Sequence, residues 1–163
     1  MSTEMTEIHG GDGNLPDGTI VIVASRYNAS ICDALVTGAV ETLRAAGLDD
    51  STIRVVRVPG AWELPLASAN AADDESVLGV VALGAVIEGE TTHDQHINRA
   101  VSDALMNLGL RTGKPIGFGL LTCRSLEQAI NRSGGTVGNK GEEAAGAVIE
   151  MLRLAEKVKT AAV

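Results

Sequence analysis

Aromatic side chains are nearly absent from this chain of 163 residues, which has one tyrosine, one tryptophan and one phenylalanine. The hydrophobic core must therefore be built from aliphatic side chains, mainly valine, leucine, isoleucine and alanine. Aromatic rings also offer flat faces on which other rings can stack. Tyr27, Trp62 and Phe118 are consequently candidates for ligand contacts, and gap filling near the surface stays open as the alternative.

Basic residues are outnumbered, and cysteine is rare. The 13 lysines and arginines stand against 21 acidic residues, a net charge of -8 that argues against binding to nucleic acid. The two cysteines are too few for a disulfide framework, and the acidic start of the chain lacks the apolar segment of a secretory signal. We therefore expect a cytoplasmic protein with free thiols.

Apolar runs long enough to span a membrane are also missing. The run that begins at Val77 ends at Ile87, well short of the roughly 20 residues that a membrane-spanning helix needs. Its valine, leucine, alanine and glycine content is typical of a strand buried on both faces of a parallel sheet. No membrane partner is expected.

The segment 88–93, EGETTH, follows this run and is the strongest candidate for a binding site. Gly89 is expected to let the backbone turn, and Thr91 or Thr92 to cap the helix that follows. A turn that leads into a helix presents free N–H groups and the positive end of the helix dipole, which suits an anion such as phosphate. His93 would lie beside that anion, and histidine is the side chain best suited to move protons near neutral pH.

Strands and helices alternate four times along the chain. This alternation predicts one α/β domain over 19–163, with a parallel sheet and right-handed crossovers. The glycine-rich segment 1–18 is expected to be a flexible arm, either disordered or ordered against a neighbouring subunit. Ser30 and Ser125 are the expected helix caps, and Pro65 falls inside the first turns of the second helix. The expected strands are 19–25, 51–58, 77–87 and 115–122, and the expected helices are 31–47, 61–72, 92–110, 126–133 and 140–159, with a glycine-rich turn at 134–139.

The conspicuous polar and aromatic residues lie just beyond the carboxyl ends of the predicted strands. Ligands of open parallel sheets bind at that edge. We therefore expect a small-molecule site there, formed by four separate loops. They contribute Tyr27 and Asn28, then Trp62 and Glu63, then residues 88–93, and finally Thr122.

Other motifs are weaker. Residues 109–115, GLRTGKP, are one residue short of a phosphate-binding loop, follow a helix, and have proline in place of the hydroxyl residue. His93 and His96 lack a third metal ligand, so no metal site is expected. Arg132 and Lys140 flank the glycine-rich turn and are either a solvated helix end or phosphate ligands, because a guanidinium can bond two oxygens at once.

Five segments of the chain together resemble the lumazine synthase family, and they occur in the family's order and at its spacings. The resemblance implies a three-layer α/β/α sandwich with a flavodoxin-like, four-stranded parallel sheet of order 2-1-3-4. The segments are SRYN (25–28), VPGAWELP (58–65), LGAVIEGETTH (83–93), FGLLT (118–122) and EQAINRSGGTVGNKG (127–141).

The resemblance also implies an activity and a set of site residues. The family condenses 5-amino-6-(D-ribitylamino)uracil with 3,4-dihydroxy-2-butanone 4-phosphate to give 6,7-dimethyl-8-ribityllumazine, water and phosphate, without a cofactor or metal. His93 would transfer protons, and Arg132 would bind phosphate from an adjacent subunit. The other implied substrate contacts are Tyr27, Asn28, Ala61, Trp62, Glu63, Ala85, Val86, Ile87, Glu90 and Thr91, with Phe118 and Lys140 from the adjacent subunit.

Several positions depart from the family pattern. Tyr27 and Trp62 stand where phenylalanine is common. Both rings can still stack on a substrate, so we expect a pocket of altered shape that keeps its function. Glu88 replaces a frequent arginine, Glu90 a frequent small residue, and Asn131 a usual acid. The two glutamates are expected to affect the phosphate subsite.

The resemblance implies a homo-oligomer. Family members form pentamers or icosahedral shells of twelve pentamers, and the compact turn at 132–141 favours the sixty-subunit shell. An association with riboflavin synthase is a further expectation. Two other classes stay open: a non-catalytic flavodoxin-like module that binds a flavin or nucleotide, and a shell scaffold without activity. The combination of His93, Arg132 and Lys140 argues against the scaffold, because packing alone requires none of them.

Overall fold

A four-stranded parallel sheet forms the centre of the computed structural model, which describes residues 4–162. The strand order is β2-β1-β3-β4, so the predicted order and the flavodoxin-like α/β/α architecture are confirmed. The two central strands are almost wholly buried, as expected for strands with helices on both faces. The strands are β1 (Thr19–Ser25), β2 (Ile53–Val58), β3 (Val77–Ile87) and β4 (Ile116–Cys123).

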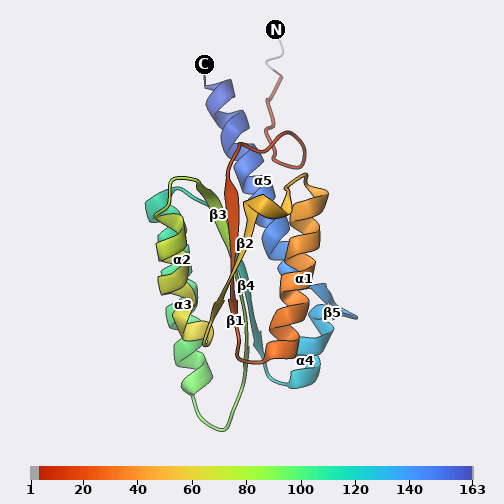
Figure 1. Ribbon diagram of the computed structural model, residues 1–163, viewed down its shortest axis with the longest axis vertical. Coiled ribbons are helices and arrows are strands. Elements are labelled where there is room, and N and C mark those ends of the chain that lie inside the picture. The colour runs from red at the N-terminus through yellow and green to blue at the C-terminus, as the bar shows by residue number, and fades with distance from the viewer. Residues whose placement is uncertain (1–3, 163) are drawn as a thin grey trace.

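Helices cover both faces of the sheet (Figure 1). On one face lie α1 (Ala29–Ala45), α4 (Leu126–Asn131) and α5 (Lys140–Ala161), and on the other lie α2 (Leu64–Ala72) and α3 (His93–Thr112). Short 3-10 turns, η1 (Asp50–Thr52) and η2 (Ala61–Glu63), flank β2. A small antiparallel hairpin of β5 (Ser133–Gly135) and β6 (Gly138–Asn139) joins α4 to α5.

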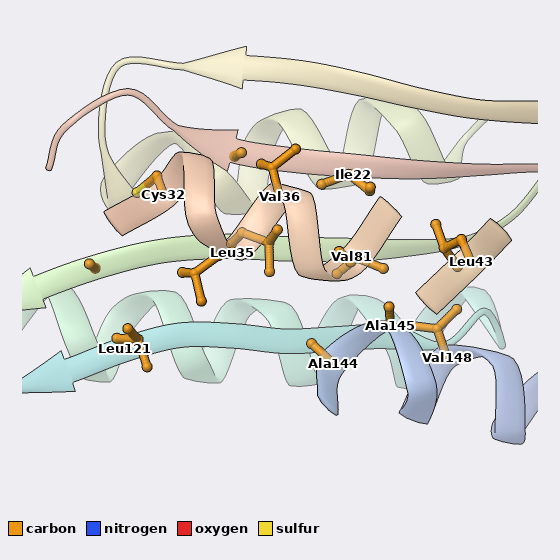
Figure 2. Packing of buried hydrophobic residues seen from close by; sticks show 14 of the residues in the cluster. Ile22, Cys32, Leu35, Val36, Leu43, Val81, Leu121, Ala144, Ala145 and Val148 are labelled. Carbon is orange, nitrogen blue, oxygen red and sulfur yellow. The ribbon is translucent and has the colours of Figure 1, made fainter. Parts of the chain in front are cut away.

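The core is aliphatic, as the scarcity of aromatic residues requires. Successive residues of β1 point to opposite faces, so that Ile20 and Ile22 pack under α1 and α5 while Val21 and Val23 pack under α2 and α3. Figure 2 shows the first of these layers, with side chains from α1, the sheet and α5, among them Leu35, Val81 and Ala145. Fully burying one such side chain contributes about 1.5–3 kcal/mol.

Asn139 fixes the start of α5 against α1. Its side-chain oxygen accepts hydrogen bonds from the N–H groups of Gly141 at 2.8 Å and Glu142 at 3.3 Å, and its amide donates to the Ala34 carbonyl at 3.0 Å. A Cβ on Gly141 would lie 2.0 Å from the Leu35 oxygen, so only glycine allows this close approach. The contact sets the position of the β5–β6 hairpin.

Two helix starts and a turn differ from the sequence-based expectation. Asn28, with a left-handed φ of 56°, occupies the N-cap position of α1, so Ser30 lies within the helix and does not cap it. The second helix begins at Leu64 after the η2 turn, which puts Pro65 at a first-turn position that needs no N–H donor. The glycine-rich turn is the β5–β6 hairpin. Ser125 does cap α4, since its hydroxyl accepts a 3.3 Å hydrogen bond from the Gln128 N–H.

The described part of the N-terminal arm lies against α5. The Lys157 ammonium donates to the His9 carbonyl at 3.0 Å and pairs with the Asp12 carboxylate, and Gly10 packs on the Glu150 backbone. Residues 1–3 of the predicted arm lie outside the described residues, and the flexibility of the arm stays a prediction. None of the helices in the described chain is long and apolar enough to cross a membrane.

Candidate active site

A cavity of about 450 Å³ opens at the carboxyl edge of the sheet, the lower edge in Figure 1. The loops after β1, β2 and β3 and the first turns of α3 form its walls. Three of the four predicted loops therefore meet in one place. The lining residues are Tyr27, Pro59, Gly60, Ala61, Trp62, Glu63, Ala85, Val86, Ile87, Gly89, Thr91, His93, Asp94 and Ile97.

The loop after β1 is tied to the end of β3. The Asn28 amide donates a 2.8 Å hydrogen bond to the Ala85 carbonyl, and the Tyr27 N–H donates to the Ser25 hydroxyl at 3.1 Å. These two bonds hold the exposed Tyr27 ring at the cavity wall. Asparagine suits this position because it tolerates a left-handed backbone and carries the donor.

The thiol beneath this loop is buried. Cys32 of α1 lies 3.2 Å from the Tyr27 carbonyl, to which its Sγ donates a hydrogen bond. Burial raises the pKa of Cys32 to about 11, above its ordinary value near 9, because the thiolate would lose solvation. The Cys32 thiol therefore stays neutral near physiological pH and is a packing and hydrogen-bonding group.

The η2 turn after β2 supplies the opposite wall. One carboxylate oxygen of Glu63 accepts a 2.9 Å hydrogen bond from the Gly60 N–H, which holds the carboxylate close to the turn. Ala61 is buried beneath, and Trp62 is exposed at the rim. This wall therefore combines a fixed carboxylate with an indole ring.

Free backbone donors follow β3. Among the described hydrogen bonds, none uses the N–H groups of Gly89, Glu90 or Thr91. The Thr91 hydroxyl accepts from the His93 N–H at 3.4 Å, while Thr92 occupies the N-cap position without a side-chain bond. Gly89 has no left-handed backbone and open space around it, so neither its φ nor its surroundings restrict this position to glycine. The exposed His93 begins α3 beside these amides.

Among the predicted site residues, Asn28 and Glu90 adjoin lining residues without lining the cavity themselves, and three others belong to other elements. Phe118 is half exposed on β4, opposite Ala82. Arg132 ends α4, where its guanidinium donates to the Gln128 carbonyl at 3.2 Å, and Lys140 begins α5 with an ion pair to Glu143 at 2.5 Å. The Lys140 N–H donates to the Arg132 carbonyl at 2.8 Å, so the two basic residues face each other across the base of the β5–β6 hairpin. None of the three lines the cavity of its own chain.

Four lining residues were not predicted: Pro59, Gly60, Asp94 and Ile97. Pro59 and Gly60 belong to the VPGAWELP segment, so the motif contained the signal. Asp94 and Ile97 are three residues apart and share a face of α3, a spacing that could have indicated a common environment. His96, between them, is exposed, and no group of three potential metal ligands occurs in the described chain.

Comparison with known proteins decides the family. The family model described as 6,7-dimethyl-8-ribityllumazine synthase matches residues 17–156. A protein of that name from Rhodopirellula baltica is 57% identical over 155 residues, which cover 95% of this chain and 100% of the relative. The chain belongs to the lumazine synthase family. Further relatives of this name in Xanthomonas campestris pv. campestris and Nitratidesulfovibrio vulgaris are both 44% identical, over 90% and 84% of this chain and 95% and 88% of their own lengths.

Family membership confirms the resemblance seen in the five sequence segments. The chain is accordingly an enzyme, a synthase of the transferase type, and it has a lumazine synthase role. The lumazine synthase match begins two residues before β1 and ends within α5, so it contains every loop that lines the cavity.

Proposed function

We propose that the protein condenses 5-amino-6-(D-ribitylamino)uracil with 3,4-dihydroxy-2-butanone 4-phosphate to 6,7-dimethyl-8-ribityllumazine, with release of water and phosphate, in riboflavin biosynthesis. The observation that carries this proposal is that one cavity brings together free backbone amides, His93 and an aromatic, polar wall. Such a cavity can hold a flat polar heterocycle and a phosphorylated ketone side by side.

The amine substrate occupies the wall between the loops after β1 and β2. The Tyr27 ring stacks on the pyrimidine, and Asn28 fixes that loop through its bond to Ala85. The Ala61–Trp62 backbone and the Glu63 carboxylate bind the ribityl chain, and Ala85, Val86 and Ile87 border the heterocycle. Most of these contacts come from backbone and aliphatic groups, which suits a neutral substrate.

The phosphate of the second substrate binds the amides of Glu90 and Thr91 and the Thr91 hydroxyl. The helix dipole of α3 adds to the attraction of these N–H groups for an anion. The Glu90 side chain is exposed, which allows its carboxylate to point into solvent. Arg132, Lys140 and Phe118 complete the subsite from an adjacent subunit, with Arg132 bonding two phosphate oxygens.

His93 moves the protons of the reaction. Imine formation, phosphate elimination and ring closure each require proton transfer between reactants that are already bound. Holding the two reactants in place can supply about 7–11 kcal/mol in favourable cases. A single positioned acid or base contributes roughly 10²–10⁴-fold in addition, so His93 and good orientation suffice without a metal or an organic cofactor.

The protein works as a cytoplasmic homo-oligomer built from pentamers, in a sixty-subunit shell that can associate with riboflavin synthase. Large apolar side chains support a subunit interface on the α2–α3 side: Leu66, Met106 and Leu110 are exposed by 69%, 66% and 76%. Phe118 of β4 is exposed as well. Light scattering checks the assembly, because a pentamer and a shell differ twelvefold in mass.

The test of the activity mixes the purified protein with both substrates and follows the fluorescence of the lumazine product. Product formation well above the uncatalysed background supports the synthase, and a His93→Ala variant that stays folded serves as the control. No product above background with the wild-type protein would exclude the proposed reaction.

A further inference from the structure

Asp94 is a carboxylate in the cavity that the motifs do not account for. It lies in the first turn of α3, one residue after His93, and lines the cavity together with Ile97. Its Oδ1 atom is buried and has no hydrogen-bond partner. A buried carboxylate oxygen without a partner is costly, and a bound donor would remove that cost.

The charges around the cavity indicate which substrate supplies the donor. The lining residues of this chain include two carboxylates, Asp94 and Glu63, and neither lysine nor arginine. A carboxylate that faced a phosphate would repel it, whereas hydroxyl and N–H groups of a neutral molecule are donors that a carboxylate accepts well. Asp94 therefore fits the neutral amine substrate and disfavours the phosphorylated one.

The position of Asp94 on α3 agrees with this assignment. The free amides of the phosphate subsite precede His93, while Asp94 and Ile97 lie further along α3, a helix that contacts η2. The η2 turn carries Ala61, Trp62 and Glu63, the wall assigned to the ribityl chain and polar edge. The terminal torsion of an aspartate is broad, so a small rotation can bring the shielded oxygen to the cavity surface.

We infer that Asp94 is a specificity-determining residue that accepts a hydrogen bond from a hydroxyl or N–H donor of the ribitylaminouracil substrate. This inference rests on the proposed function. It assigns to Asp94 the recognition of one substrate only, and it leaves proton transfer to His93.

Initial rates of the full-length enzyme, measured against each substrate in turn, test the inference. A hydrogen bond to a charged group, when lost, weakens binding about tenfold or more. We therefore expect Asp94→Ala to raise the KM for the amine substrate about tenfold or more and to change the KM for the phosphorylated substrate less than about twofold. Asp94→Asn keeps an acceptor oxygen of the same shape and should restore part of the affinity, which a purely structural effect would not predict.

Asn98 provides the matched control. Its side-chain oxygen is also buried and without a partner one turn further along α3, but Asn98 does not line the cavity. Asn98→Ala should leave both KM values unchanged. An amine analogue with a methyl group in place of the ribityl chain identifies the donor. If Asp94→Ala no longer raises the KM for this analogue, the donor is a hydroxyl of the ribityl chain; if the KM still rises, the donor is on the ring.

Three results would overturn the inference: an unchanged KM for the amine in Asp94→Ala, an equal rise of both KM values, or the same rise in Asn98→Ala. Failure of the proposed function looks different, because the wild-type enzyme would then form no lumazine. If Asp94→Ala does not fold, Asp94→Asn takes its place: a rise in the KM for the amine that is smaller than tenfold but absent for the phosphorylated substrate supports the inference, and no rise or an equal rise of both KM values overturns it.

Discussion

Asn28 links the local backbone to the shape of the cavity, and two replacements separate its contributions. It is the only non-glycine residue with positive φ among residues 4–162, and its side chain donates the 2.8 Å bond to the Ala85 carbonyl. Asn28→Gly keeps the left-handed backbone and removes the bond. Asn28→Ala removes the bond and adds backbone strain. The neighbouring Tyr27 ring loses its fixed support in both variants.

The magnitudes follow from these two effects. Loss of one hydrogen bond costs about 0.5–1.5 kcal/mol, and a left-handed backbone costs an ordinary L-residue about 1–2 kcal/mol more. Asn28→Ala should therefore lower the free energy of unfolding by about 1.5–3.5 kcal/mol. Glycine adopts the left-handed backbone without strain, but it loses more conformational entropy on folding, which costs about 0.5–1 kcal/mol. We expect Asn28→Gly to be about 1 kcal/mol less destabilising than Asn28→Ala.

Urea unfolding measures the free energy of unfolding of both variants. The protomer concentration is kept fixed, because subunit association also contributes to stability. Ser30→Ala is the control: Ser30 is exposed within α1 and does not cap it, so its loss should change stability by less than about 0.5 kcal/mol. Equal destabilisation by glycine and alanine, or none by either, would refute the reasoning from the Asn28 backbone and its bond to Ala85.

Three further predictions concern single side chains. His93→Ala should lower kcat by roughly 10²–10⁴-fold with a small change in either KM; stopped-flow fluorescence measures this, and an unchanged kcat would remove His93 from the chemistry. Arg132→Ala should raise the KM for the phosphorylated substrate and leave the KM for the amine unchanged in steady-state kinetics, and the reverse pattern would contradict the phosphate assignment. The pKa of Cys32, raised to about 11 by burial, lies above that of the unfolded thiol, so stability should fall as the pH rises from about 9 to 11. Urea midpoints of wild type and Cys32→Ala check this, and the same pH dependence in both proteins would speak against it.

The parallel sheet and the placement of the helices could be predicted from the sequence because their signals are strong and local, whereas the strand order was implied by the family resemblance. The buried run of β3 and the alternation of strands with amphipathic helices specify a parallel sheet with helices on both faces. The start of α1 could not be predicted in this way. Ser30 carries the usual side chain of a helix cap, whereas the observed start depends on the bond from Asn28 to Ala85, 57 residues away.

The site shows the same division. Tyr27, Trp62, Glu63 and His93 meet in the cavity because each follows a parallel strand, which the sequence pattern indicates. Asp94 was not among the predicted contacts, because the missing partner of its shielded oxygen is a property of the folded chain that no motif carries. For Phe118, Arg132 and Lys140 the family resemblance supplies a role across a subunit boundary. The single chain keeps these three away from its own cavity.

Crystals of the enzyme soaked in phosphate test the central claim most directly, since everything proposed depends on an anion bound after β3 with His93 in reach. We expect phosphate density within hydrogen-bond distance of the Glu90 and Thr91 amides, with the His93 imidazole facing the same space. Density at another place, or a His93 ring turned away from the cavity, would contradict the account.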